Sequence, residues 1–326
     1  MYQRKTFDIS NVVKRILSVP TLISFVLITG IIIVLVTGLD ISLSKVMSII
    51  FSANPLPFIL AFITHYLGFA FRGIRWKYII GEVDSPQKPP TVEYIKLIFL
   101  SNFINSASLF RIGDLYKVYA FDKKYAKGFT NLLGTLITER LLDCIMLAIL
   151  IGIFGQSLLQ SSNQELQILV IIPLILLSIL LIAFLIVTRI DKIPSYPIFT
   201  NLILKAKEGA QIPKPKIAPA FIMSIFAWGC EIMRVYFIAS ALRFDLEFAH
   251  TSIIALVHAM LTLVPTPGGI GAVESGVAGL GTLLLNMTPE NSIALILLDR
   301  SITYLSVLII GAVVFIWELV DLNKKK

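Results

Sequence analysis

Charged side chains are scarce in this sequence. Asp, Glu, Lys and Arg make up 15% of its 326 residues, hydrophobic residues make up 56%, and the mean hydropathy is +0.86. Soluble domains carry about 25% charged and about 45–50% apolar residues. A soluble fold of this length could not bury the excess, so the composition excludes an ordinary soluble enzyme and predicts an all-α polytopic membrane protein. At about 20 residues per spanning helix, the length allows about six to eight crossings.

Cysteine, histidine and the usual catalytic motifs are scarce too. The only cysteines, Cys144 and Cys230, lie in apolar runs, where a disulfide or a metal site is not expected. The three histidines, His65, His250 and His258, are too dispersed to indicate a metal site. The sequence has no nucleophile–base pair, Walker loop or dinucleotide fingerprint, so neither a cofactor nor an enzymatic activity is expected. Any pumping would depend on an ion gradient or on the lipid gradient itself.

Six apolar segments are long enough to span a membrane: 20–38, 54–74, 129–155, 166–188, 217–241 and 290–318. The run 20–38 is too long for the core of a signal peptide and is predicted to be the first membrane helix. The net charge of +8 comes from short loops, where positive residues set topology and contact lipid heads rather than nucleic acid. Six crossings place both termini in the cytoplasm, and we expect a plasma-membrane location.

Two further apolar stretches, 92–110 and 248–287, are predicted to be re-entrant helical hairpins. Positive residues place both ends of the first stretch in the cytoplasm: Arg72, Arg75, Lys77 and Lys88 before it, and Arg111, Lys117, Lys123, Lys124 and Lys127 after it. Its polar run at 101–106 is predicted to hold the turn. The second stretch is broken at 265–271 by Pro-Thr-Pro-Gly-Gly-Ile-Gly, which stops a continuous helix. Irregular backbone at membrane depth must be buried in protein or line a cavity.

This layout indicates an internal repeat with an offset of about 160 residues. Each half contains three crossings and one hairpin, and an odd number of crossings inverts the second half relative to the first. Inverted repeats with interrupted helices are common in secondary transporters, whose site lies at the repeat interface. We therefore predict one transmembrane domain over 1–326, with inverted halves at about 1–160 and 161–326.

Charged residues repeat at the same offset. Asp114 lies 26 residues before Arg140, and Glu274 lies 26 residues before Arg300. Charges inside membrane segments are costly, so by default they face the protein interior and mark function. The alternative is that the acids and arginines recur by chance and only neutralise one another between helices.

Other charges in the apolar segments fall on shared helical faces. Glu139 and Asp143 are four residues apart, and Glu231 and Arg234 are three apart. Asp299 directly precedes the arginine of the second repeat. For Glu231 and Arg234, a structural ion pair that holds helices together explains the three-residue spacing at least as well as a functional role does.

The proline- and glycine-rich break offers a second kind of site. Its backbone N–H groups are predicted to lie at the start of a helix over about 271–286, where helix N-termini attract anions such as a lipid phosphate. Glu274 lies in the first turn of this helix. It either caps the helix and stabilises it by about 0.3–1 kcal/mol, or binds an amine or a proton. Gly271, Ser275 and Gly279 recur every four residues and predict a ridge for close helix packing. The candidate residues of the break are Pro267, Gly268, Gly269 and Gly271.

Two stretches resemble a known family. The first runs from Asn105 to Lys117, contains Arg111-Ile-Gly-Asp114, and is followed by Thr138-Glu139-Arg140. The second runs from Val264 to Glu274, contains Pro267-Gly-Gly-Ile-Gly271, and is followed by Asp299-Arg300. In this order and spacing they resemble the flippase-like family named after the transmembrane region of lysylphosphatidylglycerol synthase, over about residues 15–320.

The resemblance implies a stand-alone protein that moves a lipid or a lipid-linked sugar between leaflets, without a synthase domain. Lipid heads are predicted to enter a cavity between the two hairpins, where Arg111, Arg140 and Arg300 hold the phosphate. Four acids then balance charge or bind a cationic head group: Glu139, Asp143, Glu274 and Asp299. Asp114 completes the set of candidate site residues.

The expected partners are membrane lipids with an anionic or phosphate-bearing head group, and no nucleic acid. The sequence leaves open whether the protein uses a coupling ion or proton, forms a homo-oligomer or binds a biosynthetic partner. One alternative is an integral membrane transferase acting on a lipid-linked donor, which would give a product of altered mass. Another is an accessory subunit of a glycan- or lipid-modifying complex, which would co-purify with its partner.

Overall fold

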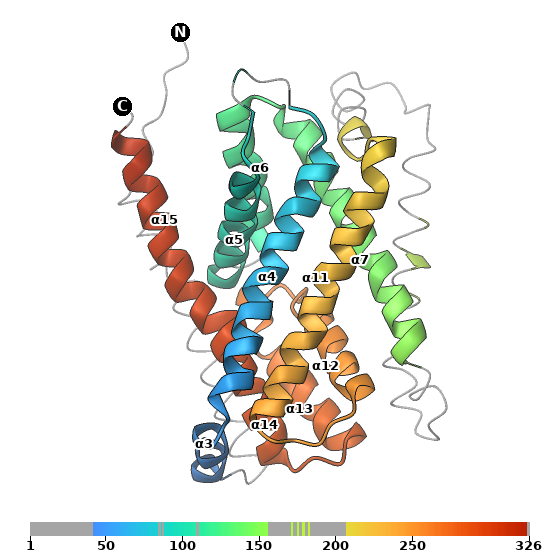
Figure 1. Ribbon diagram of the computed structural model, residues 1–326, viewed down its shortest axis with the longest axis vertical. Helices are drawn as coiled ribbons and strands as arrows, with labels where there is room; N and C mark the ends of the chain where they lie inside the picture. The colour runs from blue at the N-terminus through green and yellow to red at the C-terminus, as the bar shows by residue number, and fades with distance from the viewer. Residues whose placement is uncertain are drawn as a thin grey trace.

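The computed structural model describes residues 42–155 except 84–85, 87 and 109–110, five single positions between 171 and 182, and residues 207–324. All regular structure in this part of the chain is helical, in this order: α3 (Leu43–Phe51), α4 (Pro55–Ile80), α5 (Thr91–Ala107), α6 (Ile112–Tyr125), α7 (Phe129–Phe154), α11 (Lys214–Ala241), α12 (Phe248–Leu261), η2 (Pro267–Gly269), α13 (Ala272–Leu284), α14 (Pro289–Arg300), η3 (Ser301–Ser306) and α15 (Val307–Lys324). Figure 1 shows the long helices standing roughly side by side.

Within the described residues, three helices are long and apolar enough to cross a membrane: Pro55–Ile80, Lys214–Ala241 and Pro289–Glu318. They match three of the predicted spans. α7 occupies a fourth and is 26 residues long, but it carries three charged residues, Glu139, Arg140 and Asp143. The predicted span 20–38 and nearly all of 166–188 lie outside the described residues. The described helices fit the helical membrane class, and the number of six crossings stays a prediction.

α4 and α11 form the central pair. They lie side by side and run in opposite directions (Figure 1). Gly68 of α4 allows this close approach, since a Cβ there would lie 3.5 Å from the Cβ of Cys230 on α11. At its start α4 is capped by Asn54, whose side chain accepts the N–H of Leu56, and it ends at Gly81, whose φ is +72°. This antiparallel pair gives the molecule its long axis.

α5 and α6 form the first hairpin, which begins and ends at the upper end of the molecule in Figure 1. The two limbs touch at Gly113, where a Cβ would lie 2.0 Å from the carbonyl oxygen of Ser101. The N–H of Gly113 donates to Oδ1 of Asn105 at 2.8 Å. Only glycine fits this contact, so the hairpin depends on it.

The predicted turn at 101–106 is wrong, because α5 remains helical to Ala107. α6 begins at Ile112, directly after Arg111, whose φ is +51°. The polar run stays helical because its side chains bond across to α6: Ser101 Oγ donates to Asp114 at 2.9 Å. The second limb of the hairpin is therefore 112–125, a segment that charge alone had assigned to the cytoplasm.

α12 and α13 form the second hairpin, which begins and ends at the lower end in Figure 1. The predicted break is confirmed, since α12 ends at Leu261 and α13 begins at Ala272. Three glycines in the break have positive φ: Gly268 at 59°, Gly269 at 71° and Gly271 at 84°. The predicted packing ridge is wrong at Gly279, because a Cβ there would meet no heavy atom within 4 Å. Gly276 makes the close contact instead, against Leu261.

The tips of the two hairpins meet near the middle of the molecule. The Nη1 of Arg111, at the first tip, donates to the carbonyl oxygen of Thr262, at the second, over 3.2 Å. A Cβ on Gly268 would lie 2.7 Å from the ring of Tyr304 and 3.7 Å from the Cα of Ser106. The second tip is therefore packed against η3 and the end of α5, and Arg111 joins the first tip to the second.

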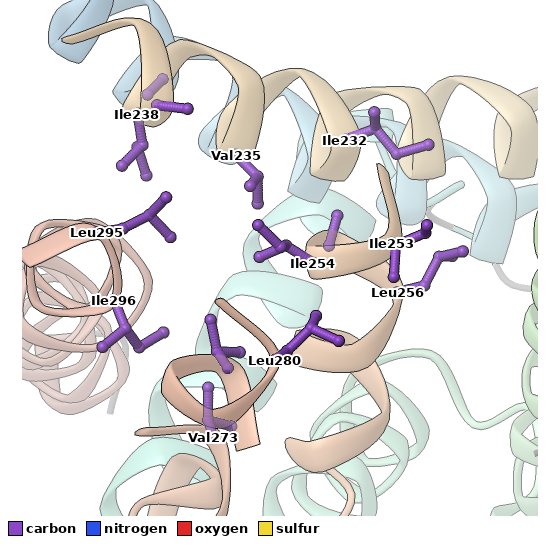
Figure 2. Close-up of a cluster of buried hydrophobic side chains, with 14 of the residues drawn as sticks. Ile232, Val235, Ile238, Ile253, Ile254, Leu256, Val273, Leu280, Leu295 and Ile296 are labelled. Atoms are coloured by element: carbon purple, nitrogen blue, oxygen red, sulfur yellow. The ribbon is translucent and has the colours of Figure 1, made fainter. Parts of the chain in front are cut away.

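Apolar packing forms two main clusters. Figure 2 shows the larger one, in which isoleucine, valine and leucine side chains of α11, α12, α13 and α14 interdigitate, among them Ile238, Ile254, Val273, Leu280 and Leu295. The second cluster is rich in aromatic side chains of α4, α5 and α6. It is completed by Val307 and Phe315 of α15. Each hairpin thus has an apolar core of its own, and their polar tips are left to face one another.

Candidate functional site

A cavity of about 280 Å³ lies where the hairpin tips meet. Both tips line it, together with the middle of α4, α7 and α11 and the start of η3. Its volume is near the lower end of the range for small-ligand pockets, about 300–1,000 Å³. The charged residues of its wall are Arg72, Arg111, Arg140, Asp143, Glu231 and Arg300.

On the side of the second hairpin, the predicted pair of Glu274 and Arg300 is formed. Arg300 Nε lies 2.7 Å from Oε1 of Glu274, and Arg300 Nη1 donates to the carbonyl oxygen of Gly268 at 3.0 Å. The other carboxylate oxygen of Glu274 accepts the N–H of Gly271 at 2.6 Å. Glu274 therefore caps α13, and the N–H of Gly271 that was predicted to attract a lipid phosphate is taken by the chain's own carboxylate.

On the side of the first hairpin, the equivalent pair is looser. The guanidinium of Arg140 lies 3.7 Å from Asp114 and 3.6 Å from Asp143. Asp114 also faces Arg111 at 3.7 Å and accepts hydrogen bonds from the α5 side chains. Because 44% of the Arg140 side chain is open, this arginine presents its charge to the cavity. The two acid–arginine pairs spaced by 26 residues are thus both present and differ in tightness.

A chain of ion pairs crosses from α4 to α12. Arg72 lies 2.8 Å from Glu231, and Glu231 lies 3.0 Å from Arg234 on the same helix. Arg234 also pairs with Asp299 of α14, which faces His258 of α12 at 3.2 Å. Four helices are therefore joined through alternating charges at the level of the cavity.

Two basic residues that charge alone assigned to the cytoplasm, Arg75 and Lys117, are buried between helices, and a third, Arg72, is half-buried. α4 continues to Ile80, so Arg72 and Arg75 lie within it, and Arg75 binds Asp143 at 2.6 Å. Lys117 of α6 lies 2.5 Å from Glu139 of α7, with both side chains 2% exposed. Charge counting did not predict this burial, because these cations gain acidic partners from helices distant in sequence. Arg72 and Glu231 lie 159 residues apart, so the repeat offset was a signal for one of these pairs.

The cavity wall contains five of the twelve candidate site residues: Arg111, Arg140, Asp143, Gly268 and Arg300. The other seven do not line it: Asp114, Glu139, Pro267, Gly269, Gly271, Glu274 and Asp299. The wall also contains residues that the sequence did not single out for this role, namely His65, Arg72, Trp228, Glu231 and His258. Among the described residues, no group of three or more His, Cys, Asp or Glu side chains is placed to hold a metal ion.

Known relatives are membrane proteins. A UPF0104 membrane protein of Methanocaldococcus jannaschii is 29% identical over 220 residues, covering 65% of this chain and 93% of the relative. A second one from the same organism is 25% identical over 316 residues, 88% of this chain and 92% of the relative. A third, from Methanothermobacter thermautotrophicus, is 25% identical over 300 residues, 83% of this chain and 86% of the relative. The family described as the lysylphosphatidylglycerol synthase TM region matches residues 21–311. Because that match spans most of the sequence, this chain belongs to the lysylphosphatidylglycerol synthase TM region family.

Proposed function

We propose that this protein moves a lipid between the two leaflets of the membrane, with the head group held in the cavity between the hairpin tips. The observation that carries the proposal is the placement of Arg111, Arg140 and Arg300 around one cavity at the meeting point of the two hairpins. An anionic head group would find its counter-charges there, at the depth where crossing is otherwise most costly. A family named after the membrane part of a lipid synthase is consistent with a lipid substrate.

The arrangement of the helices supports alternating access. α4 and α11 run in opposite directions, and each is followed by a hairpin and then by a long helix (Figure 1). In this proposal the two sets are inverted halves, and the hairpins are re-entrant from opposite faces of the membrane. Opening one half against the other would expose the cavity to each leaflet in turn.

The charge distribution supports an orientation. Lysines gather at one end of the molecule, on the end of α4, on the outer ends of α5 and α6, and at the starts of α7 and α11. By the positive-inside rule this end faces the cytoplasm. The proposal therefore places the opening of the first hairpin and both termini in the cytoplasm, and the protein in the plasma membrane.

Arg140 is the strongest candidate for direct contact with the head group. Charge-assisted hydrogen bonds are about 2.7–2.9 Å long, whereas the acids nearest to Arg140 lie 3.6 and 3.7 Å away. Its guanidinium can donate a bidentate pair of hydrogen bonds to a phosphate, the geometry that arginine favours, without breaking a tight ion pair. Arg300 is held by Glu274 at 2.7 Å, so its main role in this proposal is to shape the second tip.

The ion-pair network around the cavity carries an excess of one positive charge. Its seven basic members are Arg72, Arg75, Arg111, Lys117, Arg140, Arg234 and Arg300, and its six acidic members are Asp114, Glu139, Asp143, Glu231, Glu274 and Asp299. Each of these acids already has a basic partner within 4.0 Å among the described residues. A negatively charged head group would neutralise the excess, whereas an amine would have to displace an existing pair.

The test is leaflet exchange in sealed proteoliposomes containing fluorescent phospholipids, with mass spectrometry of the lipids from the same sample. Arg140→Gln removes the charge from the cavity wall. Arg243→Gln makes the same change at an exposed position between α11 and α12. We expect exchange to be lost in the first variant and kept in the second. Normal exchange by folded Arg140→Gln would refute the site, and a lipid of new mass without exchange would favour the membrane transferase instead.

A further inference from the structure

Apart from His258, whose Nε2 faces a carboxylate oxygen of Asp299 at 3.2 Å, three buried residues of the cavity wall have nitrogen atoms without a hydrogen-bond partner among the described residues. They are both ring nitrogens of His65, Nε1 of Trp228 and Nη2 of Arg300. The side chains come from α4, α11 and α14, and the residues are 8%, 4% and 8% exposed. Buried polar groups are nearly always satisfied in native proteins, so three such residues around one cavity indicate a polar ligand.

The type of each free group restricts that ligand. The indole N–H and the guanidinium only donate hydrogen bonds, so they match phosphate or hydroxyl oxygens. A neutral imidazole has one donor and one acceptor, which is what a hydroxyl group also has. No ion pair joins His65 to a carboxylate among the described residues, and Glu231, the acid of the cavity wall that acts on it, is paired with Arg72 and Arg234.

The two acids of the cavity wall are already shared between cations. Asp143 lies 2.6 Å from Arg75 and 3.6 Å from Arg140. Glu231 lies 2.8 Å from Arg72 and 3.0 Å from Arg234. An ammonium or an aminoacyl head group would therefore meet surplus positive charge without a free counter-ion. The cavity volume of about 280 Å³ further limits the head group to a small one.

We infer that the cavity selects phosphodiester lipids whose head group is small, uncharged and hydroxylated, with phosphatidylglycerol as the representative of this class. The inference rests on the proposed function and adds the chemistry of the head group to it. Arg140 neutralises the phosphodiester charge. The unpaired nitrogens of His65, Trp228 and Arg300 pair with the remaining phosphate oxygen and the hydroxyl groups.

The test compares three lipids that share one fluorescent acyl chain, using the full-length protein in proteoliposomes. Phosphatidylglycerol has a single negative charge and hydroxyl groups, phosphatidylethanol has the same charge without hydroxyl groups, and phosphatidylethanolamine carries an amine. We expect phosphatidylglycerol to exchange at least about tenfold faster than the other two, because a site built to bond a hydroxyl rejects an analogue that lacks it. Equal rates for phosphatidylglycerol and phosphatidylethanol would overturn the inference and leave the proposed function standing. Exchange of none of the three lipids would overturn both.

A protein variant checks the assignment of the free donor. Trp228→Phe removes the indole N–H and keeps a ring in place. Exchange of phosphatidylglycerol is expected to fall to about the rate of phosphatidylethanol, and an unchanged Tm and size-exclusion profile of the variant report an intact fold. Trp317→Phe, at a position of α15 that is 67% exposed, is the matched control and should change neither rate. An equal loss for both lipids, or no loss for either, would overturn the role of Trp228 in reading the hydroxyl groups.

Discussion

The ion pair of Lys117 and Glu139 gives a test of the packing between the first hairpin and α7. Its atoms lie 2.5 Å apart, both side chains are 2% exposed, and the Lys117 ammonium also lies 5.0 Å from the centre of the Trp76 ring. Removing one partner of a buried pair costs about 3–5 kcal/mol. We therefore expect Glu139→Gln to lower the Tm by roughly 6 °C or more.

The double variant Lys117→Met with Glu139→Leu separates the pair from its surroundings. Replacing both charges with apolar side chains of similar size is often neutral or stabilising, so the Tm should return close to that of the wild type. Lys45 and Glu290 form the control pair at 3.2 Å, with the Lys45 side chain 57% exposed. Breaking it should cost at most about 1 kcal/mol. The assay is thermal unfolding of the purified protein in detergent, followed by tryptophan fluorescence. A double variant as unstable as Glu139→Gln, or equal losses at both pairs, would refute the reasoning.

Two further predictions concern packing and access. Gly113→Ala should prevent closure of the first hairpin and abolish monodisperse protein, because the new Cβ would lie 2.0 Å from the carbonyl oxygen of Ser101. Gly279→Ala adds a methyl group in open space and should be neutral or stabilising by up to about 1 kcal/mol, as size-exclusion profiles and the Tm would show. Cys144 lines the cavity and Cys230 is buried outside it, so a small charged thiol reagent should label the first much faster than the second. A saturating concentration of the lipid substrate should slow the labelling of Cys144, measured by mass spectrometry of the intact protein. A labelling rate unaffected by the lipid would contradict the cavity assignment.

The two hairpins show which structural features can be predicted from charge and composition and which cannot. The break in the second was placed correctly because Pro267 and the neighbouring glycines break a helix through local chemistry alone. The turn of the first was misplaced because Ser101 and Asn105 look like loop residues in sequence. Their side chains are satisfied by Asp114 across the hairpin, so the backbone there has no reason to leave the helix. Local signals predict breaks, whereas a polar residue inside a helix is explained only by its distant partner.

The same distinction holds for the cavity. The acid–arginine pairs ending at Arg140 and Arg300 were predictable because they repeat at a fixed spacing within each half. Arg72 and Arg75 were assigned to the cytoplasmic flank, since positive charges near the end of an apolar run usually set topology. Their true neighbours, Glu231 and Asp143, come from other helices. That α4 remains helical up to Ile80 could not be read from the apolar run alone.

The contact between the hairpin tips has a consequence for how the chain is made. Arg111 finds its acceptor on Thr262, 151 residues later. At a synthesis rate of about 5–20 residues per second, the first tip waits roughly 8–30 s for its counterpart to emerge. During that interval its polar groups need water, lipid heads or an insertion factor. Assembly of the membrane domain is therefore a late event, and a ribosome stalled before the second hairpin would hold a protein whose first hairpin is not yet secured.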